Sequence, residues 1–98
     1  MGLMRVRVIG PSMEPALRNG QVCWVGRGRL RPGHIAVFVE PHRPGLVSIK
    51  RIVRREGAGW WVEGDNAEMS TDSRVYGAVA ESSFLGRVIW PRSTPIRG

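Results

Sequence analysis

The sequence predicts a mostly β fold in a single small domain, residues 1–98, built from short antiparallel strands. Three observations support this fold class. The chain has 98 residues, which is enough for one modest hydrophobic core. Its 13 glycines and 7 prolines divide it into short segments. Several of these segments alternate apolar and polar residues or are rich in β-branched residues, as strands are.

The first half of the chain predicts four strands. Residues 5–8 alternate Arg and Val, and Gly10 and Pro11 end this strand so that Ser12 begins a turn. The strands that follow are short apolar runs between loops rich in Gly, Pro and Arg. We expect strands at residues 21–25, 35–40 and 46–54, with loops at residues 26–33 and 41–45.

The second half predicts further short strands between glycine-rich turns. We expect turns at residues 56–59 and 64–66, strands at residues 60–63, 74–79 and 85–90, and a loose tail at residues 91–98.

The charged residues single out one lysine. The formal net charge is +7, and 14 of the 15 basic residues are Arg, so that Lys50 stands alone. Arg can supply a permanent positive charge, whereas only the Lys ammonium can be made neutral by burial. We therefore interpret Lys50 as a residue retained for its titratable amine, with a chance remnant as the alternative.

Ser12 and Lys50 form a nucleophile and its base if the fold brings them together. Because strand side chains alternate, Leu46 and Ile52 share a face with Lys50 and give its amine apolar neighbours. A lysine needs its pKa lowered by about three units to act as a base at neutral pH, and burial supplies shifts of that size. The alternative is a Lys50 side chain that extends to solvent or pairs with Asp65.

Three segments resemble the signature boxes of the type I signal peptidases and follow one another in the same order. They are Gly10-Pro11-Ser12-Met13-Glu14-Pro15, Ile49-Lys50-Arg51-Ile52-Val53 and the segment from Gly64 to Gly77, GDNAEMSTDSRVYG. The resemblance implies a partly open, barrel-like sheet, as in the signal peptidase catalytic core. It also implies that Ser12 is the nucleophile, Lys50 the general base and Ser70 a hydroxyl that hydrogen-bonds and orients the Lys50 amine.

The same resemblance implies which residues support the site and bind substrate. The backbone N–H of Ser12 would be the first oxyanion donor, and Gly10 stands where some family members carry a second donor, a Ser hydroxyl. Substrate would lie as an added strand between residues 9–11 and 47–49. The charged network expected to brace the site is Arg51, Asp65, Asp72 and Arg74. The residues expected at the oxyanion and substrate site are Ile9, Gly10, Pro11, Met13, Val47, Ser48 and Ile49.

Two features set the chain apart from the secretory signal peptidases. Its longest apolar run, residues 35–39, is too short to cross a membrane, and residues 1–10 lack the pattern of a secretory signal. Residues 58–59 form a very short connection where those enzymes often carry an extra β domain. This form looks most like the bacterial nickel-type superoxide dismutase maturation proteases. We expect a cytoplasmic serine endopeptidase that removes the N-terminal leader of the dismutase proenzyme, with peripheral membrane association left open.

Other function classes fit the residues less well. Cys23 is the only cysteine, and its spacing from His34 and His42 matches no metal site, so no disulfide, metal or cofactor is expected. The dispersed Arg residues argue against a nucleic acid partner. His34 follows a Pro-Gly turn, which argues against a triad of Ser12, His34 and an Asp. Processing of secretory preproteins and a non-catalytic peptide-binding β module remain as alternatives, and the oligomeric state is not predicted.

Overall fold

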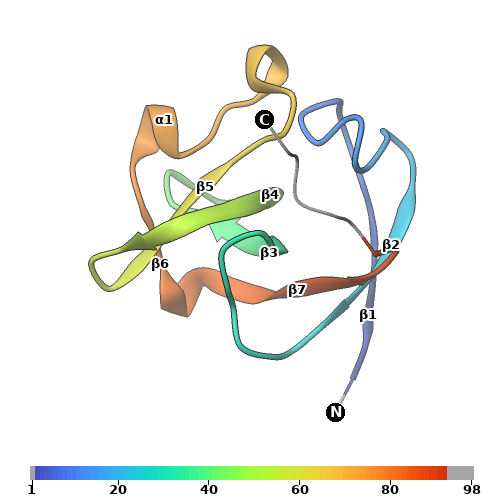
Figure 1. Cartoon of the computed structure of the whole chain (residues 1–98), viewed down its shortest axis with the longest axis horizontal. Helices are drawn as coiled ribbons and strands as arrows, with labels where there is room; N and C mark the ends of the chain where they lie inside the picture. The colour runs from blue at the N-terminus through green and yellow to red at the C-terminus, as the bar shows by residue number, and fades with distance from the viewer. Residues whose placement is uncertain (1, 93–98) are drawn as a thin grey trace.

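A seven-stranded antiparallel sheet forms most of the molecule (Figure 1). The structure is a computed structural model that describes residues 2–92, and residues 93–98 of the expected loose tail lie outside the described residues. The strands lie in the order β1-β2-β7-β3-β4-β5-β6 without closing into a barrel, which confirms the mostly β, partly open architecture. Their bounds are β1 Met4–Arg7, β2 Val22–Gly26, β3 Ile35–Glu40, β4 Arg43–Glu56, β5 Gly59–Glu63, β6 Val79–Ala80 and β7 Phe84–Trp90.

Three short helical segments lie in the second half of the chain, namely η1 Ala67–Met69, α1 Ser73–Tyr76 and η2 Glu81–Ser83. The expected strand at residues 74–79 is wrong, because α1 occupies its first half and only its last residue belongs to a strand, the short β6. The Asp72 carboxylate caps α1 by accepting the Arg74 N–H, and Gly77 ends the helix with a φ of 80°. The cap at Asp72 therefore favours a helix at residues where the alternation of side chains predicted a strand.

Strand β4 is longer than expected and leaves part of one edge unpaired. The predicted loop at residues 41–45 is too long, because the chain turns at residues 41–42 and β4 begins at Arg43. β4 pairs with β3 along its first part and with β5 only from Arg51 onward. Within the described chain, the second edge of β4 before Arg51 has no partner strand, and β1 pairs on one side only.

Two hydrophobic cores use alternate side chains of β3, because successive residues of a strand point to opposite faces. The first core contains Val8, Met13, Leu17, Cys23, Val25, Ile35, Val37 and Ile49. The second core contains Ala36, Phe38, Ile52, Trp60, Val62 and Val79. Strand β4 contributes Ile49 to the first core and Ile52 to the second, so Lys50 is held on a rigid strand between two buried anchors.

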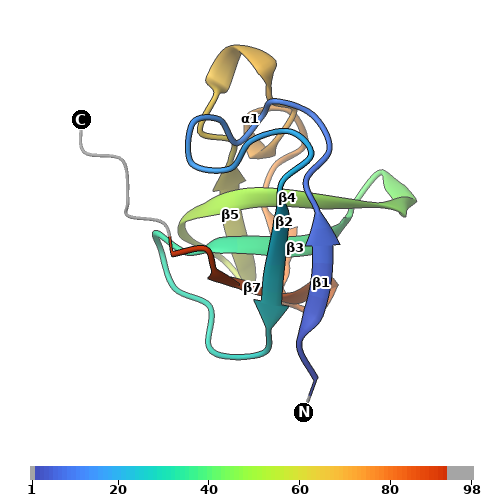
Figure 2. The same cartoon turned by 90° about the vertical axis from the view of Figure 1, so that its right-hand side faces the viewer.

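The long loop between β1 and β2 lies beside the segment that follows β5 (Figure 2). Asn66 joins the two segments: its backbone N–H donates to the Ser12 carbonyl oxygen at 2.8 Å, and its side-chain amide donates to the Pro11 carbonyl oxygen at 3.1 Å. The fold thereby brings together sequence segments that surround Ser12, Lys50 and Ser70.

Candidate active site

Ser12 lies in a turn that buried side chains attach to the sheet. Gly10 precedes it with a φ of 90°, a backbone conformation that glycine adopts without strain. After Ser12 the Leu17 N–H donates to the Met13 carbonyl oxygen at 2.9 Å, and both side chains are fully buried in the first core. Core packing therefore fixes the backbone that presents the Ser12 hydroxyl.

The Lys50 amine meets the Ser12 hydroxyl. Lys50 Nζ and Ser12 Oγ are hydrogen-bonded at 2.9 Å, and Lys50 is only 7% exposed. Burial lowers the pKa of Lys50 below its usual value, while the carboxylates of Asp72 and Glu40 oppose this effect. A lowered pKa increases the fraction of neutral amine, which is the form that can accept the Ser12 proton.

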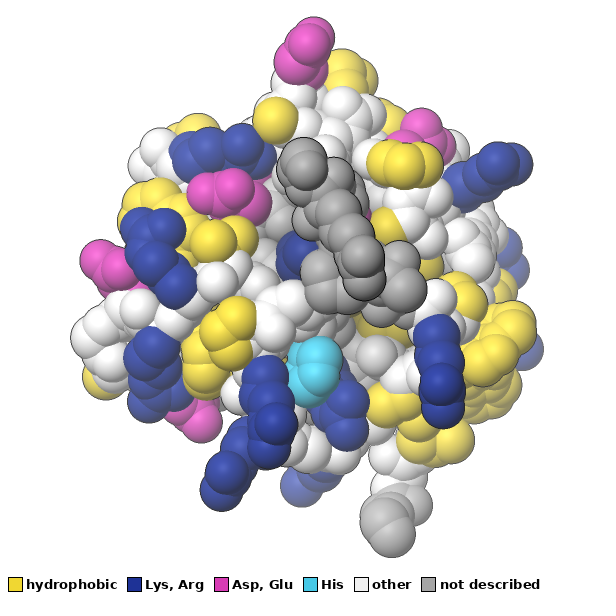
Figure 3. Space-filling view, viewed as in Figure 1, with side chains coloured by type: hydrophobic (Ala, Val, Ile, Leu, Met, Phe, Trp, Pro, Cys, Tyr) yellow, Lys and Arg dark blue, Asp and Glu magenta, His cyan; other side chains and the backbone are white. Residues whose placement is uncertain are grey.

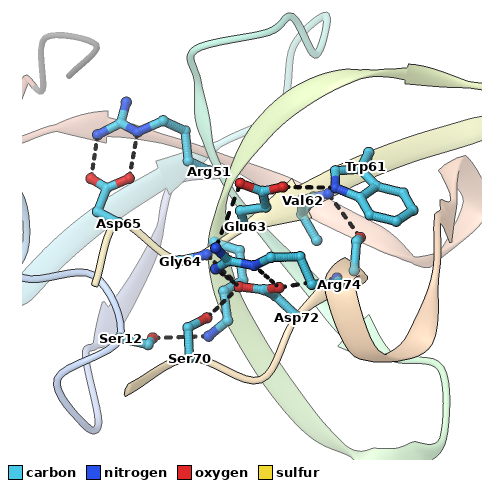
Figure 4. A network of polar contacts seen from close by, with 12 residues as sticks. Ser12, Arg51, Trp61, Val62, Glu63, Gly64, Asp65, Ser70, Asp72 and Arg74 are labelled. Atoms are coloured by element: carbon cyan, nitrogen blue, oxygen red, sulfur yellow. Dashed lines mark hydrogen bonds and ion pairs between the residues drawn. The ribbon is translucent and has the colours of Figure 1, made fainter. Parts of the chain in front are cut away.

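Ser70 contacts Asp72 in this structure rather than Lys50. The Ser70 hydroxyl donates to Asp72 Oδ2 at 2.6 Å, and the Lys50 amine has Ser12 as its one hydrogen-bond partner among the described residues. The expected bond between Ser70 and Lys50 is therefore absent here, because the Ser70 proton points to Asp72. The Ser70 oxygen, which Figure 4 shows directed at Asp72, keeps lone pairs that can accept a hydrogen bond. An orienting role for Ser70 stays a prediction.

Asp72 is a fully buried carboxylate that several donors surround. The Arg74 side chain binds both carboxylate oxygens, at 2.9 and 2.6 Å, and the Gly64 N–H donates to Oδ2 at 2.8 Å (Figure 4). Burial alone would raise the pKa of Asp72, but the hydrogen bonds from Arg74, Ser70 and Gly64 outweigh burial and hold the pKa well below its usual range. Asp72 therefore remains a fixed negative charge near the amine.

Arg51 and Asp65 form the second half of the expected network. Arg51 donates through Nε and Nη2 to the two Asp65 oxygens at 2.8 and 2.7 Å (Figure 4). Its Nη1 donates to the Gly33 carbonyl oxygen at 2.7 Å. Their side chains are 10% and 4% exposed. This buried, two-point ion pair ties β4 to the segment that follows β5.

Two residues with a clear structural role in the site were not predicted from the sequence. Asn66 donates hydrogen bonds to the carbonyl oxygens of Pro11 and Ser12, which belong to the two peptide groups that flank Ser12. Gly64 lies so close to this turn that a Cβ there would be 2.7 Å from the Ser12 carbonyl oxygen and 2.6 Å from the Ser70 Cβ. Both belong to the third signature-like segment, so their position in that segment was the available signal.

The oxyanion donors are partly defined. Within residues 2–92 the backbone N–H of Ser12 has no hydrogen-bond partner, so it is available to a substrate oxygen. The Gly10 N–H donates to the Asn19 side-chain oxygen at 2.8 Å and is thus occupied. Gly10 consequently supplies neither a side-chain nor a free backbone donor as the second group.

A cleft of about 390 Å³ lies in front of Ser12 and Lys50, between the unpaired edges of β1 and β4. Expected substrate-site residues that line it are Ile9, Gly10, Pro11, Val47, Ser48 and Ile49. Met13 does not line it, because its side chain is packed in the first core beneath the turn. Glu40, which was not predicted, lies in the cleft and is only 9% exposed.

The remaining candidate groups lie away from this chemistry. Cys23 is fully buried, and burial raises the pKa of its thiol, so it is a poor nucleophile. His34 lines a different pocket, with Arg87, and its pKa is lowered by burial and then by the charges of Arg87 and Arg31. In residues 2–92 no group of three or more His, Cys, Asp or Glu side chains is placed to hold a metal ion.

The surface shows no single basic patch on the face seen in Figure 3, where Lys and Arg side chains are spread among apolar and acidic ones. None of the helices in the described part of the chain has the length and apolar character needed to cross a bilayer.

Sequence comparison finds curated relatives that share most of the chain. It is 32% identical to the mitochondrial inner membrane protease subunit 1 of Xenopus tropicalis over 110 aligned positions, which cover 84% of this chain and 66% of the relative. It is 30% identical to the proteins of the same name from Homo sapiens and Mus musculus, covering 86% of this chain and 68% of each relative. The chain therefore spans about two thirds of the length of these relatives. No family model matches the chain.

Proposed function

Because the chain belongs to the family of the mitochondrial inner membrane protease subunit 1, which is signal peptidase I-like, we propose that it is a serine endopeptidase with a Ser/Lys dyad. The observation that carries this proposal is the 2.9 Å contact between Ser12 Oγ and the buried Lys50 Nζ, whose pKa burial lowers. A hydroxyl beside a desolvated amine is the arrangement that a nucleophile and its base require.

The proposed reaction uses this pair twice. The neutral Lys50 amine accepts the Ser12 proton as Ser12 Oγ attacks the scissile carbonyl carbon, and the Ser12 N–H stabilises the oxyanion. The resulting ammonium returns the proton to the leaving amine as the peptide bond breaks. A water molecule then donates a proton to Lys50 while it attacks the acyl-enzyme. Lys50 passes this proton to Ser12 Oγ as the acyl–oxygen bond breaks, which releases the second product and restores both residues.

The substrate is proposed to bind as an added strand in the cleft. Extended peptide beside β4 would pair with backbone groups of residues 47–49 and, across the cleft, with residues 9–11. Ile9 and Val47 are exposed there, at 78% and 50%, and offer apolar contacts to substrate side chains. Such a site accepts a flexible leader segment near the end of a proprotein.

We rank the leader of a nickel superoxide dismutase proenzyme first as substrate, ahead of secretory preproteins. The β4–β5 hairpin turns through Gly57 and Ala58, which leaves no inserted domain at the point where secretory signal peptidases often carry one. A non-catalytic peptide-binding module would not need both members of the Ser12 and Lys50 contact.

The test incubates the protein with a leader-bearing dismutase proenzyme and, separately, with a signal-peptide substrate in detergent. The dyad would be supported if the wild type cleaves a substrate and the cleavage rate falls at least about a hundredfold in Ser12→Ala and in Lys50→Ala. Ser82→Ala, an exposed serine on η2, is the matched control and should cleave normally. Full activity of Lys50→Arg would overturn the mechanism, because a guanidinium cannot accept the Ser12 proton.

A further inference from the structure

Glu40 places a carboxylate in the cleft that the proposed dyad reaction does not use. It is the last residue of β3, is 9% exposed and lines the same cleft as Ser12 and Lys50. Its Oε2 accepts a hydrogen bond from the Ser48 hydroxyl at 2.8 Å. Across residues 2–92, Oε1 has no hydrogen-bond or ion-pair partner. One oxygen of a nearly buried carboxylate is thus left free to accept from a ligand.

Among the described residues no cation that lines the cleft forms an ion pair with Glu40, and the Lys50 charge acts on Glu40 only at longer range. Arg7 Nη1 donates to the Gly20 carbonyl oxygen at 2.8 Å, and Lys50 Nζ is bonded to Ser12. Arg43 is exposed at the mouth and forms no ion pair with Glu40 among the described residues. An apolar substrate side chain pressed against Glu40 would remove water from Oε1 without replacing its hydrogen bond, which is unfavourable.

The position of Glu40 beside β4 indicates how far from the scissile bond it would meet the substrate. Its partner Ser48 precedes Lys50 by two residues on β4, so both side chains point to the same face of the strand, about 7 Å apart along it. A substrate strand that runs beside β4 advances at the same rate per residue. The substrate side chain level with Ser48 and Glu40 therefore lies within about two residues of the peptide bond that faces Ser12.

We propose that Glu40, held by Ser48, forms a specificity subsite for a basic substrate side chain, Lys or Arg, within about two residues of the scissile bond. This inference rests on the proposed function and adds a substrate class to it. A charge-assisted hydrogen bond to Oε1 would complete the coordination of the carboxylate and neutralise its charge. The subsite therefore selects one basic residue in a segment that is otherwise small or apolar.

The test uses a set of synthetic decapeptides that carry a cleavable Ala-rich segment. Each peptide has Lys, Ala or Glu at one of the positions on either side of the scissile bond, and kcat/KM is measured for each. We expect one position at which Lys is preferred over Ala by about tenfold, the size of one charge-assisted hydrogen bond. In Glu40→Gln, which keeps an acceptor for Ser48, this ratio should fall to about one.

The comparison of two peptides on the same variant separates recognition from folding, because a general loss of activity leaves their ratio unchanged. Glu56→Gln, an exposed carboxylate of β4 outside the cleft, is the matched control and should keep the preference for Lys. Cleavage of the Ala peptides without a position that prefers Lys would refute the subsite and leave the proposed protease intact. A preference for Glu, or a Lys preference that persists in Glu40→Gln, would refute it as well. No cleavage of any peptide would contradict the proposed function and the subsite together.

Discussion

Arg51 and Asp65 form a two-point ion pair, at 2.8 and 2.7 Å, and each is the chain neighbour of a residue that forms or supports the contact between Ser12 and Lys50. Arg51 follows Lys50, and Asp65 precedes Asn66, which donates hydrogen bonds to the carbonyl oxygens of Pro11 and Ser12. This pair therefore connects the strand that carries Lys50 to the segment that holds the Ser12 turn. A substitution in this ion pair should therefore disturb both the Lys50 strand and the Ser12 turn.

Asp65→Asn should destabilise the fold strongly. The substitution leaves the nearly buried Arg51 guanidinium with no charged partner, and breaking one side of such a pair costs about 3–5 kcal/mol in the free energy of unfolding. Urea denaturation at pH 7 measures the effect. Glu56→Gln is the matched control, because it breaks the half-exposed ion pair with Arg54 and should cost less than about 1 kcal/mol. Equal losses in both variants would contradict a structural role for the Arg51–Asp65 pair.

Lys50→Met should raise the melting temperature at pH 7, although it abolishes cleavage. The pKa of Lys50 is lower in the folded protein than the value of 10.5 that applies when it is unfolded, so the unfolded chain binds its proton more readily. This preference destabilises the fold at neutral pH and disappears as the pH rises towards 10.5. The gain in melting temperature should therefore shrink between pH 7 and 10.5, as scanning calorimetry can show.

The same shift predicts how activity depends on pH. The wild-type kcat/KM should rise with pH as the Lys50 ammonium loses its proton, with a midpoint below 10.5. Asp72, Glu40 and Ser12 face the amine, and the two carboxylates raise its pKa. Glu40→Gln should therefore move the midpoint to lower pH. A midpoint that stays unchanged would show that the Glu40 charge does not act on Lys50.

Asp72→Asn should destabilise the protein in a pH-dependent way. The pKa of Asp72 in the folded protein lies below the ordinary 3.8, so the carboxylate stabilises the fold fully above that pH and loses this contribution as the pH falls below it. We expect a loss of about 1–3 kcal/mol at pH 7, because Asp72 is fully buried and its donors lose a charged acceptor, while Arg74 is partly exposed. Thermal unfolding from pH 7 down to pH 2 should show wild type and variant converging below about pH 4.

Gly64→Ala should reduce activity by moving the nucleophile. The added methyl group would overlap the Ser12 carbonyl oxygen and the Ser70 side chain, and a displacement of about 1 Å can cost up to about a hundredfold in rate. Gly45→Ala is the matched control, because nothing lies within 4 Å of a Cβ at that position. Measurement of kcat/KM on one peptide should show a loss of at least about tenfold only in Gly64→Ala.

The sequence predicted the mostly β fold and the charged network better than it predicted local detail. A continuous apolar, β-branched run identifies β3, because both of its faces are buried, and signature-like spacing identifies Arg51 and Asp65. The prediction failed at α1, because the hydrogen bond by which Asp72 caps the helix is a local side-chain contact that alternation of apolar residues does not reveal. Glu40 was missed for a related reason, since one Glu at a strand end gives no sign that it will be nearly buried.

The unpaired edges of β1 and β4 have a consequence for the conformation of any molecule that is cut. A segment can bond to both edges only with its own backbone groups free, and a helix or an internal sheet strand has already committed those groups. Folded parts of a polypeptide are thus shielded from Ser12 by their own secondary structure. With substrate bound as the proposed added strand, hydrolysis would be confined to stretches without secondary structure, and the folded part of a substrate would be spared.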